Sequence, residues 1–99
     1  MARFDVYPDP NDAGFLLDVQ SDLLVQLNTT IVVPLMPVAN APQAAKRLNP
    51  SFDIGGVPHV MVTQFMAAVP ISALKDAHGS FVDQADEITN ALDMLFFGF

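Results

Sequence analysis

The distribution of apolar and polar residues predicts short β-strands over the first three quarters of the chain. Residues 3–7 alternate polar and apolar positions, as a half-buried strand does, and residues 8–14 form a turn-rich segment with prolines and a glycine. Residues 15–20 are predicted to return as a second strand, with one apolar face made of Phe15, Leu17 and Val19. The sharp break after this strand is followed by the exposed-looking pair Leu23 and Leu24.

Further strands are predicted in the middle of the chain. The β-branched residues at 29–33 favour a strand, and Pro34 is expected to mark a bulge or an edge because proline has no N–H for a ladder hydrogen bond. Residues 40–50 are typical of an irregular loop with a helical turn at 43–48. A last strand, interrupted by a proline, is predicted at 65–71.

A β-hairpin is predicted where two glycines separate two apolar segments. Residues 52–54 precede Gly55 and Gly56, and residues 57–63 follow them. The two central residues of a tight hairpin turn favour positive φ angles, which glycine adopts without steric cost. The sequence therefore predicts a mainly β body.

The last fifth of the chain has the periodicity of a helix. Its apolar residues recur at spacings of three and four, at Phe81, Ala85, Ile88, Leu92 and Leu95. Ser80 and Asp83 are both candidate N-caps, and acidic residues at 83, 86 and 87 suit the positive end of a helix dipole. The predicted fold is a β-barrel-like body with one C-terminal helix packed on it.

One aromatic residue breaks the pattern of this helix. At about 100° per residue, Phe97 falls nearly opposite Ile88, among the polar residues Asp86, Asn90 and Asp93. In one interpretation the end of the helix frays, and Phe97 and Phe99 fold back onto the barrel. In the other, Phe97 protrudes as an aromatic anchor of the kind that dominates binding hot spots. A ring among carboxylates suits an arginine, through cation–π and ion-pair contacts together.

Composition indicates a folded chain that carries an interface. Its 99 residues predict one domain over 1–99, and 52% hydrophobic residues against 15% charged ones are too apolar for disorder. We expect the excess apolar surface to lie at a subunit or partner interface. No apolar segment approaches the roughly 20 residues of a membrane-spanning helix, and the first residues do not read as a signal peptide. The lack of cysteine excludes disulfides and fits a cytoplasmic protein.

The net charge of −7 argues against direct nucleic-acid binding. Such binding requires several phosphates to be neutralised, whereas the basic residues are few and form no stripe: Arg3, Lys46, Arg47 and Lys75. An acidic surface instead favours a basic patch on a protein partner.

Candidate catalytic and metal-binding residues are sparse. His59, His78, Asp76 and Asp83 are the residues from which a metal site might be assembled, but their spacing matches no metal-binding motif. His59 is interpreted as a strand-face residue and His78 as a solvated loop residue. Ser72, His78 and Asp83 match no nucleophile motif. We predict neither a metal nor a cofactor.

Several short motifs together resemble the CcdB toxin family over essentially the whole chain. The segment from Leu17 to Leu24 resembles the family's VDVQSD segment. Val33-Pro34-Leu35, the run from Ala68 to Ile71, and the ending from Ile88 to Phe99 follow in the same order and at similar spacing. This resemblance implies an SH3-like barrel of antiparallel strands with a small extra sheet and a C-terminal helix, a fold shared with MazF toxins.

The resemblance also implies a function. CcdB toxins are homodimers from toxin–antitoxin modules that bind the A subunit of DNA gyrase and trap the enzyme on cleaved DNA. A CcdA-type antitoxin neutralises them and supplies the DNA binding of the module. On this basis we expect a non-enzymatic topoisomerase poison with gyrase A, an antitoxin and a second copy of itself as partners.

The family's gyrase-binding residues correspond to particular positions of this chain. The C-terminal Trp-Gly-Ile of the family matches Phe97, Gly98 and Phe99, here called the terminal tip. Asp93 stands in place of a family asparagine, and Leu23 and Leu24 match residues near the gyrase contact. Tryptophan is the better cation–π partner, so its replacement by Phe97 bears on the potency of gyrase poisoning. The replacement of isoleucine by Phe99 bears on it as well.

Two alternatives remain open at this point. The first is a CcdB-like protein without poisoning activity or with another protein target. A MazF-like endoribonuclease would share the barrel, but cleaving RNA calls for cationic side chains to hold phosphate, of which this chain has few.

Overall fold

A computed structural model describes residues 2–11 and 14–98 of the chain. It contains seven strands and one α-helix: β1 Asp5–Pro8, β2 Phe15–Asp18, β3 Thr29–Pro37, β4 Ser51–Ile54, β5 Val57–Met61, β6 Ala67–Pro70, β7 Gly79–Ser80 and α1 Ala85–Phe97. Short 3-10 turns connect them, among which η1 (Asp22–Leu24), η3 (Thr63–Phe65), η4 (Ile71–Ala73) and η5 (Val82–Gln84) bear on the site.

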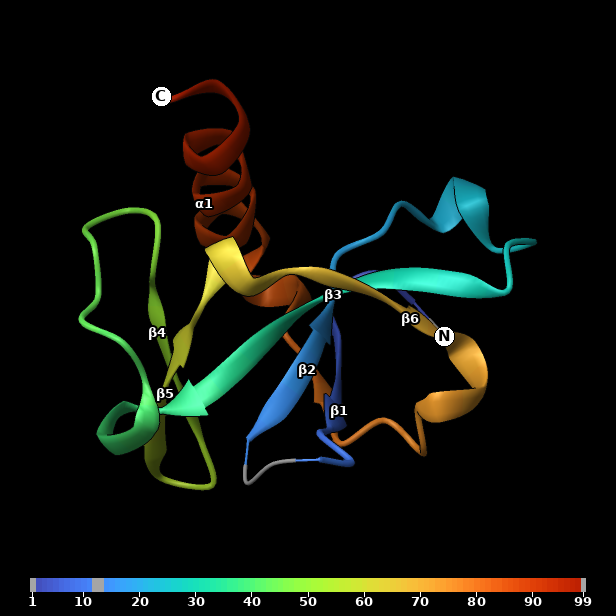
Figure 1. Cartoon of the computed structure of the whole chain (residues 1–99), viewed down its shortest axis with the longest axis horizontal. Coiled ribbons are helices and arrows are strands. Elements are labelled where there is room, and N and C mark those ends of the chain that lie inside the picture. Colours follow the sequence, from blue (N-terminus) through green and yellow to red (C-terminus); the bar gives the residue numbers. More distant parts are fainter. Residues whose placement is uncertain (1, 12–13, 99) are drawn as a thin grey trace.

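All the described strands join one antiparallel sheet that curves into a half-barrel (Figure 1). The strand order is β4-β5-β3-β2-β1-β7, and β6 pairs with β3 off this path. The predicted mainly β fold with one C-terminal helix is therefore confirmed. The small extra sheet implied by the resemblance corresponds to the branch at β6, which is hydrogen-bonded to the same long strand.

Strand β3 is longer than the sequence pattern predicted, because it continues through Pro34 as far as Pro37. Residues 32–35 pair with β2 on one side, while on the other side 29–32 pair with β6 and 35–37 pair with β5. The carbonyl of Pro34 accepts a hydrogen bond from the Val62 N–H, so the ring nitrogen of Pro34 points to the same side, at the junction of β6 and β5. The Val62 carbonyl on that side accepts its hydrogen bond from the Phe65 N–H instead, so it stays paired without an N–H from Pro34.

The predicted hairpin is confirmed as β4 and β5. Gly55 and Gly56 adopt φ angles of +60° and +80°, the left-handed conformation that glycine takes most readily. The preceding loop contains one helical turn, in which the Asn49 N–H bonds to the Ala45 carbonyl. The side chain of Asn49 then bonds to the Met61 carbonyl and ties this loop to the end of β5.

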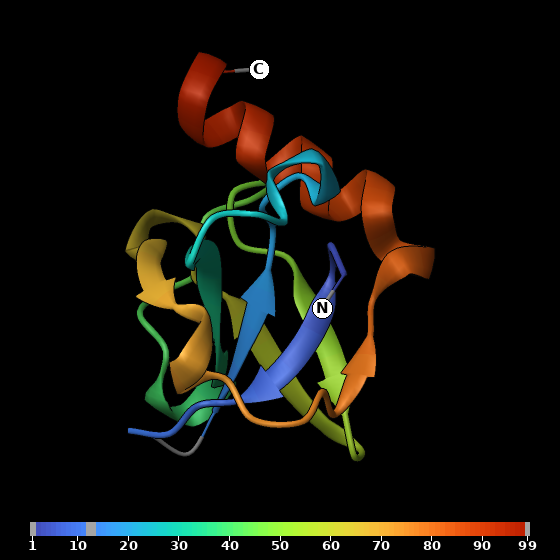
Figure 2. The ribbon, with the colours of Figure 1, turned by 90° about the vertical axis from the view of Figure 1, so that its right-hand side faces the viewer.

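The core lies between the concave face of the sheet and α1. Its buried members are Phe4, Val6, Leu17, Val19, Val33, Leu35, Phe52, Ile54, Met61, Ile88 and Ala91. Phe15 packs against this cluster beside Leu17 and Val19, which confirms the predicted apolar face of β2. The helix enters the core through Ile88 and Ala91, and Figure 2 shows that its last turn extends beyond the strands.

The start of the helix differs from the prediction. Ser80 is not an N-cap: its Oγ accepts the Val82 N–H, but the N-cap of η5 is Phe81. The helix α1 begins at Ala85, and its N-cap Gln84 makes no side-chain cap bond. Asp83 lies within η5 and is not the cap of α1. Strand β7, just before this turn, has no apolar pattern, and its pairing with β1 was not predicted.

Candidate functional site

The end of α1 presents two aromatic rings to solvent. Gly98 takes a left-handed φ of +79°, and its N–H bonds to the Met94 carbonyl, which ends the helix with a glycine C-cap. Phe97 is 67% exposed and Phe96 is 63% exposed. Of the two interpretations of Phe97, folding into the barrel is therefore wrong, whereas Phe99 lies outside the described residues.

A second apolar projection is formed by η1 and the residues that follow it. The Ser21 side chain caps this turn by accepting the Leu23 N–H at 3.2 Å, and Asp22 Oδ1 accepts the Arg3 N–H at 2.8 Å. Leu23 is 92% exposed, and the other exposed apolar side chains here are Leu24, Val25 and Leu27. The local hydrogen bonds fix the turn while its leucines face outward, as the sequence pattern predicted for Leu23 and Leu24.

The two projections lie at the same end of the molecule without meeting, since η1 and the end of α1 stand apart in Figure 1. Between them is a groove of about 400 Å³ lined by Arg3, Val19, Gln20, Ile31, Met66, Leu92 and Phe96. Asp93, on the same helical turn as Phe96, is half-buried. The predicted site residues that the structure describes thus share one end of the protein, but the single chain does not bring them into one cluster.

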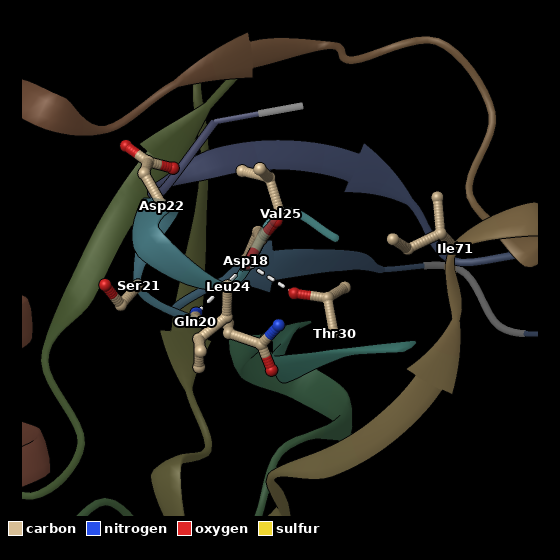
Figure 3. Close-up of a pocket in the computed structure, with 8 residues that line it drawn as sticks. All are labelled: Asp18, Gln20, Ser21, Asp22, Leu24, Val25, Thr30 and Ile71. Carbon is tan, nitrogen blue, oxygen red and sulfur yellow. Dashed lines mark hydrogen bonds between the residues drawn. The ribbon is translucent and has the colours of Figure 1, made fainter. Parts of the chain in front are cut away.

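Beside η1 lies a separate cavity of about 260 Å³ with a buried carboxyl group in its wall (Figure 3). Asp18 is only 2% exposed. Its Oδ1 accepts hydrogen bonds from Thr30 Oγ1 at 2.9 Å and from the Gln20 N–H at 3.1 Å. The sequence pattern placed Asp18 on the outer face of β2. Asp18 is buried there instead, in the wall of a cavity that it shares with Leu24, Val25 and Ile71.

Burial raises the pKa of the Asp18 carboxyl above its ordinary value of 3.8, and the charges of Asp5 and Asp22 add to this. The hydrogen bonds from Thr30 and the Gln20 N–H lower the pKa and offset part of the rise. Burial also raises the pKa of Tyr7, with the Asp5 and Asp18 carboxylates contributing. The carboxyl of Asp18 is therefore held where its charge lacks full hydration.

Asp18 should make the stability of the protein depend on pH in a defined direction. Because the folded protein binds this proton more tightly, the stabilisation is complete below the unfolded pKa and is lost as the pH rises through the raised folded pKa. The Asp18→Asn variant has no carboxyl group to deprotonate at this position, so it does not lose this stabilisation as the pH rises. Urea unfolding between about pH 3 and 7 should show the variant gaining stability relative to wild type as pH rises.

The exposed Asp53→Asn variant controls for the removal of one negative charge. A wild-type advantage that grows with pH would contradict the expected sign for Asp18.

Both histidines pack against the ring of Phe15. His59 is 4% exposed on β5, with Nδ1 2.8 Å from the Val57 carbonyl oxygen, and its ring lies 5.4 Å from that of Phe15. His78 is exposed and lies 4.9 Å from the same ring. The two positions agree with a strand-face and a loop residue, respectively. Within residues 2–11 and 14–98, no three His, Asp or Glu side chains are grouped so as to hold a metal ion.

Basic residues form no patch in the described part of the chain. Arg3 is half-buried, with its Nε–H donated to the Val19 carbonyl and its guanidinium 4.7 Å from the Phe4 ring centre. Lys46, Arg47 and Lys75 are exposed in loops. Among the same residues, no helix has the length and apolar character needed to cross a bilayer.

The fold is similar to that of two solved structures from mycobacterial species. One is an endoribonuclease in complex with its cognate antitoxin, with a TM-score of 0.74, 15% identity, and 95% of this chain and 92% of that chain covered. The other is an endoribonuclease with a TM-score of 0.75, 15% identity, and 95% and 88% covered. At this identity the likeness shows the fold alone. The family model described as CcdB protein matches residues 3–98.

Proposed function

The chain belongs to the CcdB family of toxins from toxin–antitoxin modules, and from this premise we propose that it poisons DNA gyrase by binding the A subunit through the end of α1. The observation that supports this most directly is the 67% exposure of Phe97 on the last helical turn. A solvent-exposed ring at the position of the family's tryptophan suits a pocket on another protein.

The chemistry of the contact follows from the residues at this end. The face of the Phe97 ring attracts an arginine guanidinium, and the half-buried Asp93 carboxylate lies one helical turn earlier. Leu23 and Leu24 supply apolar contacts, while Gly98 and Phe99 complete the terminal tip. In this proposal the contact is formed twice, because the protein acts as a homodimer that presents two α1 helices to the two gyrase A subunits.

Trapping requires no bond chemistry from this protein. A dimer that binds only the open conformation of gyrase shifts the population of the enzyme towards that state and blocks resealing of the DNA. The protein thus acts in the cytoplasm as a non-enzymatic poison without a cofactor, and a CcdA-type antitoxin neutralises it. The exposed apolar side chains at η1 and α1 suit such protein contacts.

The direct test is a cleavage assay with purified gyrase, ATP and supercoiled plasmid, stopped with detergent and protease. We expect linear DNA to accumulate with increasing protein and only when gyrase is present. If the folded protein produces no linear DNA at any concentration, and its induced expression leaves growth of a gyrase-sensitive host unchanged, poisoning is wrong. The chain would then be a CcdB-like protein with another target.

An endoribonuclease activity is the second candidate, favoured by the names of the solved structures that share this fold. The distribution of charge speaks against it. Arg3 is engaged by a backbone carbonyl, and Lys46, Arg47 and Lys75 lie in exposed loops, so the described residues offer no larger cationic cluster to stabilise a phosphorane-like transition state. Incubation of the purified protein with a mixed-sequence RNA should leave the RNA intact.

A further inference from the structure

The cavity beside η1 has the composition of a receptor for a positively charged side chain. Its lining combines an acidic end with an apolar rim and consists of Asp18, Gln20, Ser21, Asp22, Leu24, Val25, Thr30 and Ile71. We propose that this cavity, here called the Asp18 pocket, binds the ammonium group of a lysine side chain presented by a partner protein. The proposal is independent of the arginine contact at Phe97.

The Asp18 carboxylate has one oxygen available to a ligand. Both hydrogen bonds that it accepts from described residues end on Oδ1. No side-chain oxygen or nitrogen in this part of the chain is both fully enclosed and without a hydrogen-bond partner. Oδ2, which accepts no bond from the described residues, is therefore accessible from the cavity, although the residue as a whole is 2% exposed (Figure 3).

The negative charge around Asp18 Oδ2 favours the binding of a cation. Asp22 adds a second carboxylate to the pocket, and no arginine, lysine or histidine is among its lining residues. A buried carboxylate without a counter-ion lacks both hydration and ion pairing, so a cation placed against it gains a charge-assisted hydrogen bond and relieves this deficit. The net charge of −7 adds long-range attraction for a basic partner.

An ammonium group fits this acceptor better than a guanidinium group. The strongest guanidinium–carboxylate pairs are bidentate and use both carboxylate oxygens, but Oδ1 of Asp18 already accepts bonds from Thr30 and Gln20. Ammonium is a compact charge with three donors that can be shared between separate oxygens. Asp18 Oδ2 and the Asp22 carboxylate are such separate acceptors.

The rim of the pocket indicates that the ligand belongs to a protein. Leu24, Val25 and Ile71 form an apolar wall against which the four-carbon stem of lysine can pack. Leu24 and Val25 are 46% and 65% exposed, and this apolar surface continues to Leu23, which is 92% exposed. A free amine would fill the cavity and leave these side chains in water, whereas a protein surface around the lysine would cover them.

The test measures how small ligands that differ in charge and shape bind to the intact protein. Amide chemical shifts of the protein report the binding. n-Butylammonium should perturb residues 18–25, 30 and 71 and bind at least about tenfold more tightly than n-butanol, since a charge-assisted hydrogen bond contributes about 1.5–3 kcal/mol. Lysine with acetylated and methylamidated ends should bind as tightly as n-butylammonium, and n-butylguanidinium more weakly.

Each other outcome overturns a stated part of the proposal. Equal binding of n-butanol would show that the cavity is merely apolar. Equal or tighter binding of n-butylguanidinium would overturn the assignment to lysine. Binding of n-butylammonium without the capped lysine would assign the pocket to free amines instead of to a protein.

A pair of variants isolates the carboxylate. Asp18→Asn keeps an oxygen that can accept from Thr30 and the Gln20 N–H, so the local fold is preserved while the charge is removed. It should weaken n-butylammonium binding by about tenfold or more. Asp53→Asn, on the exposed face of β4, removes the same charge elsewhere and should leave binding unchanged. If the two variants weaken n-butylammonium binding equally, the binding depends only on the overall charge of the protein. The Asp18 pocket is then not the binding site.

Discussion

Replacing Phe97 with alanine is expected to lower the yield of gyrase-cleaved DNA by about 30- to 1,000-fold at a fixed protein concentration, because truncation of an aromatic hot-spot residue costs about 2–4 kcal/mol of binding. The ring is 67% exposed, so its loss should not weaken the core. Alanine is also the better helix former, which favours a folded α1. The gyrase cleavage assay measures the effect, with thermal unfolding as the check on the fold.

The matched control is Phe65→Ala, the same truncation at a 53% exposed ring in η3, outside the proposed contact. Its cleavage yield should stay at the wild-type level. Phe97→Trp should shift the yield the other way, by a few-fold, because tryptophan binds cations more strongly through its ring. A Phe97→Ala variant that still poisons gyrase like wild type would remove the terminal tip from the mechanism.

Much of the fold could be predicted from local pattern because the deciding interactions are local. The glycine pair at 55–56 determines the hairpin turn, and spacings of three and four place Ile88 and Leu92 on the face of α1 that packs against the core. The continuation of β3 through Pro34 depended on which side of the strand each neighbour occupies. That information lies in the tertiary pairing, and a single proline cannot reveal it.

The candidate site, like the fold, could be predicted only in part. Helical periodicity separated Phe97 from the buried face, and its exposure in the structure agrees with that reasoning. Asp18 was missed because alternation along β2 predicts only which face a side chain takes. Whether that side chain is buried depends on its tertiary neighbours, among them Ile71, more than 50 residues farther along the chain. A buried aspartate beside an exposed leucine turn has no signature in sequence spacing.

Truncation of Ile88 to alanine should destabilise the protein by about 3 kcal/mol, within the range of 2–5 kcal/mol for buried isoleucine. Ile88 is fully buried and is the largest side chain that α1 inserts into the core cluster. For a chain of this length, such a loss lowers the midpoint of thermal unfolding by about 12–24 °C. Calorimetry at constant protein concentration measures it.

The neighbouring Thr89→Ala is the control, since Thr89 is exposed on the same helix and its truncation should change stability by less than about 0.5 kcal/mol. A shift for Ile88→Ala no larger than that of the control would mean that α1 is not anchored through the core. Because α1 carries Phe97, loosening this anchor should also weaken gyrase poisoning although no contact residue has changed. That loss should shrink on cooling as the helix redocks, whereas the loss in Phe97→Ala should persist, which separates positioning of the ring from the contact itself.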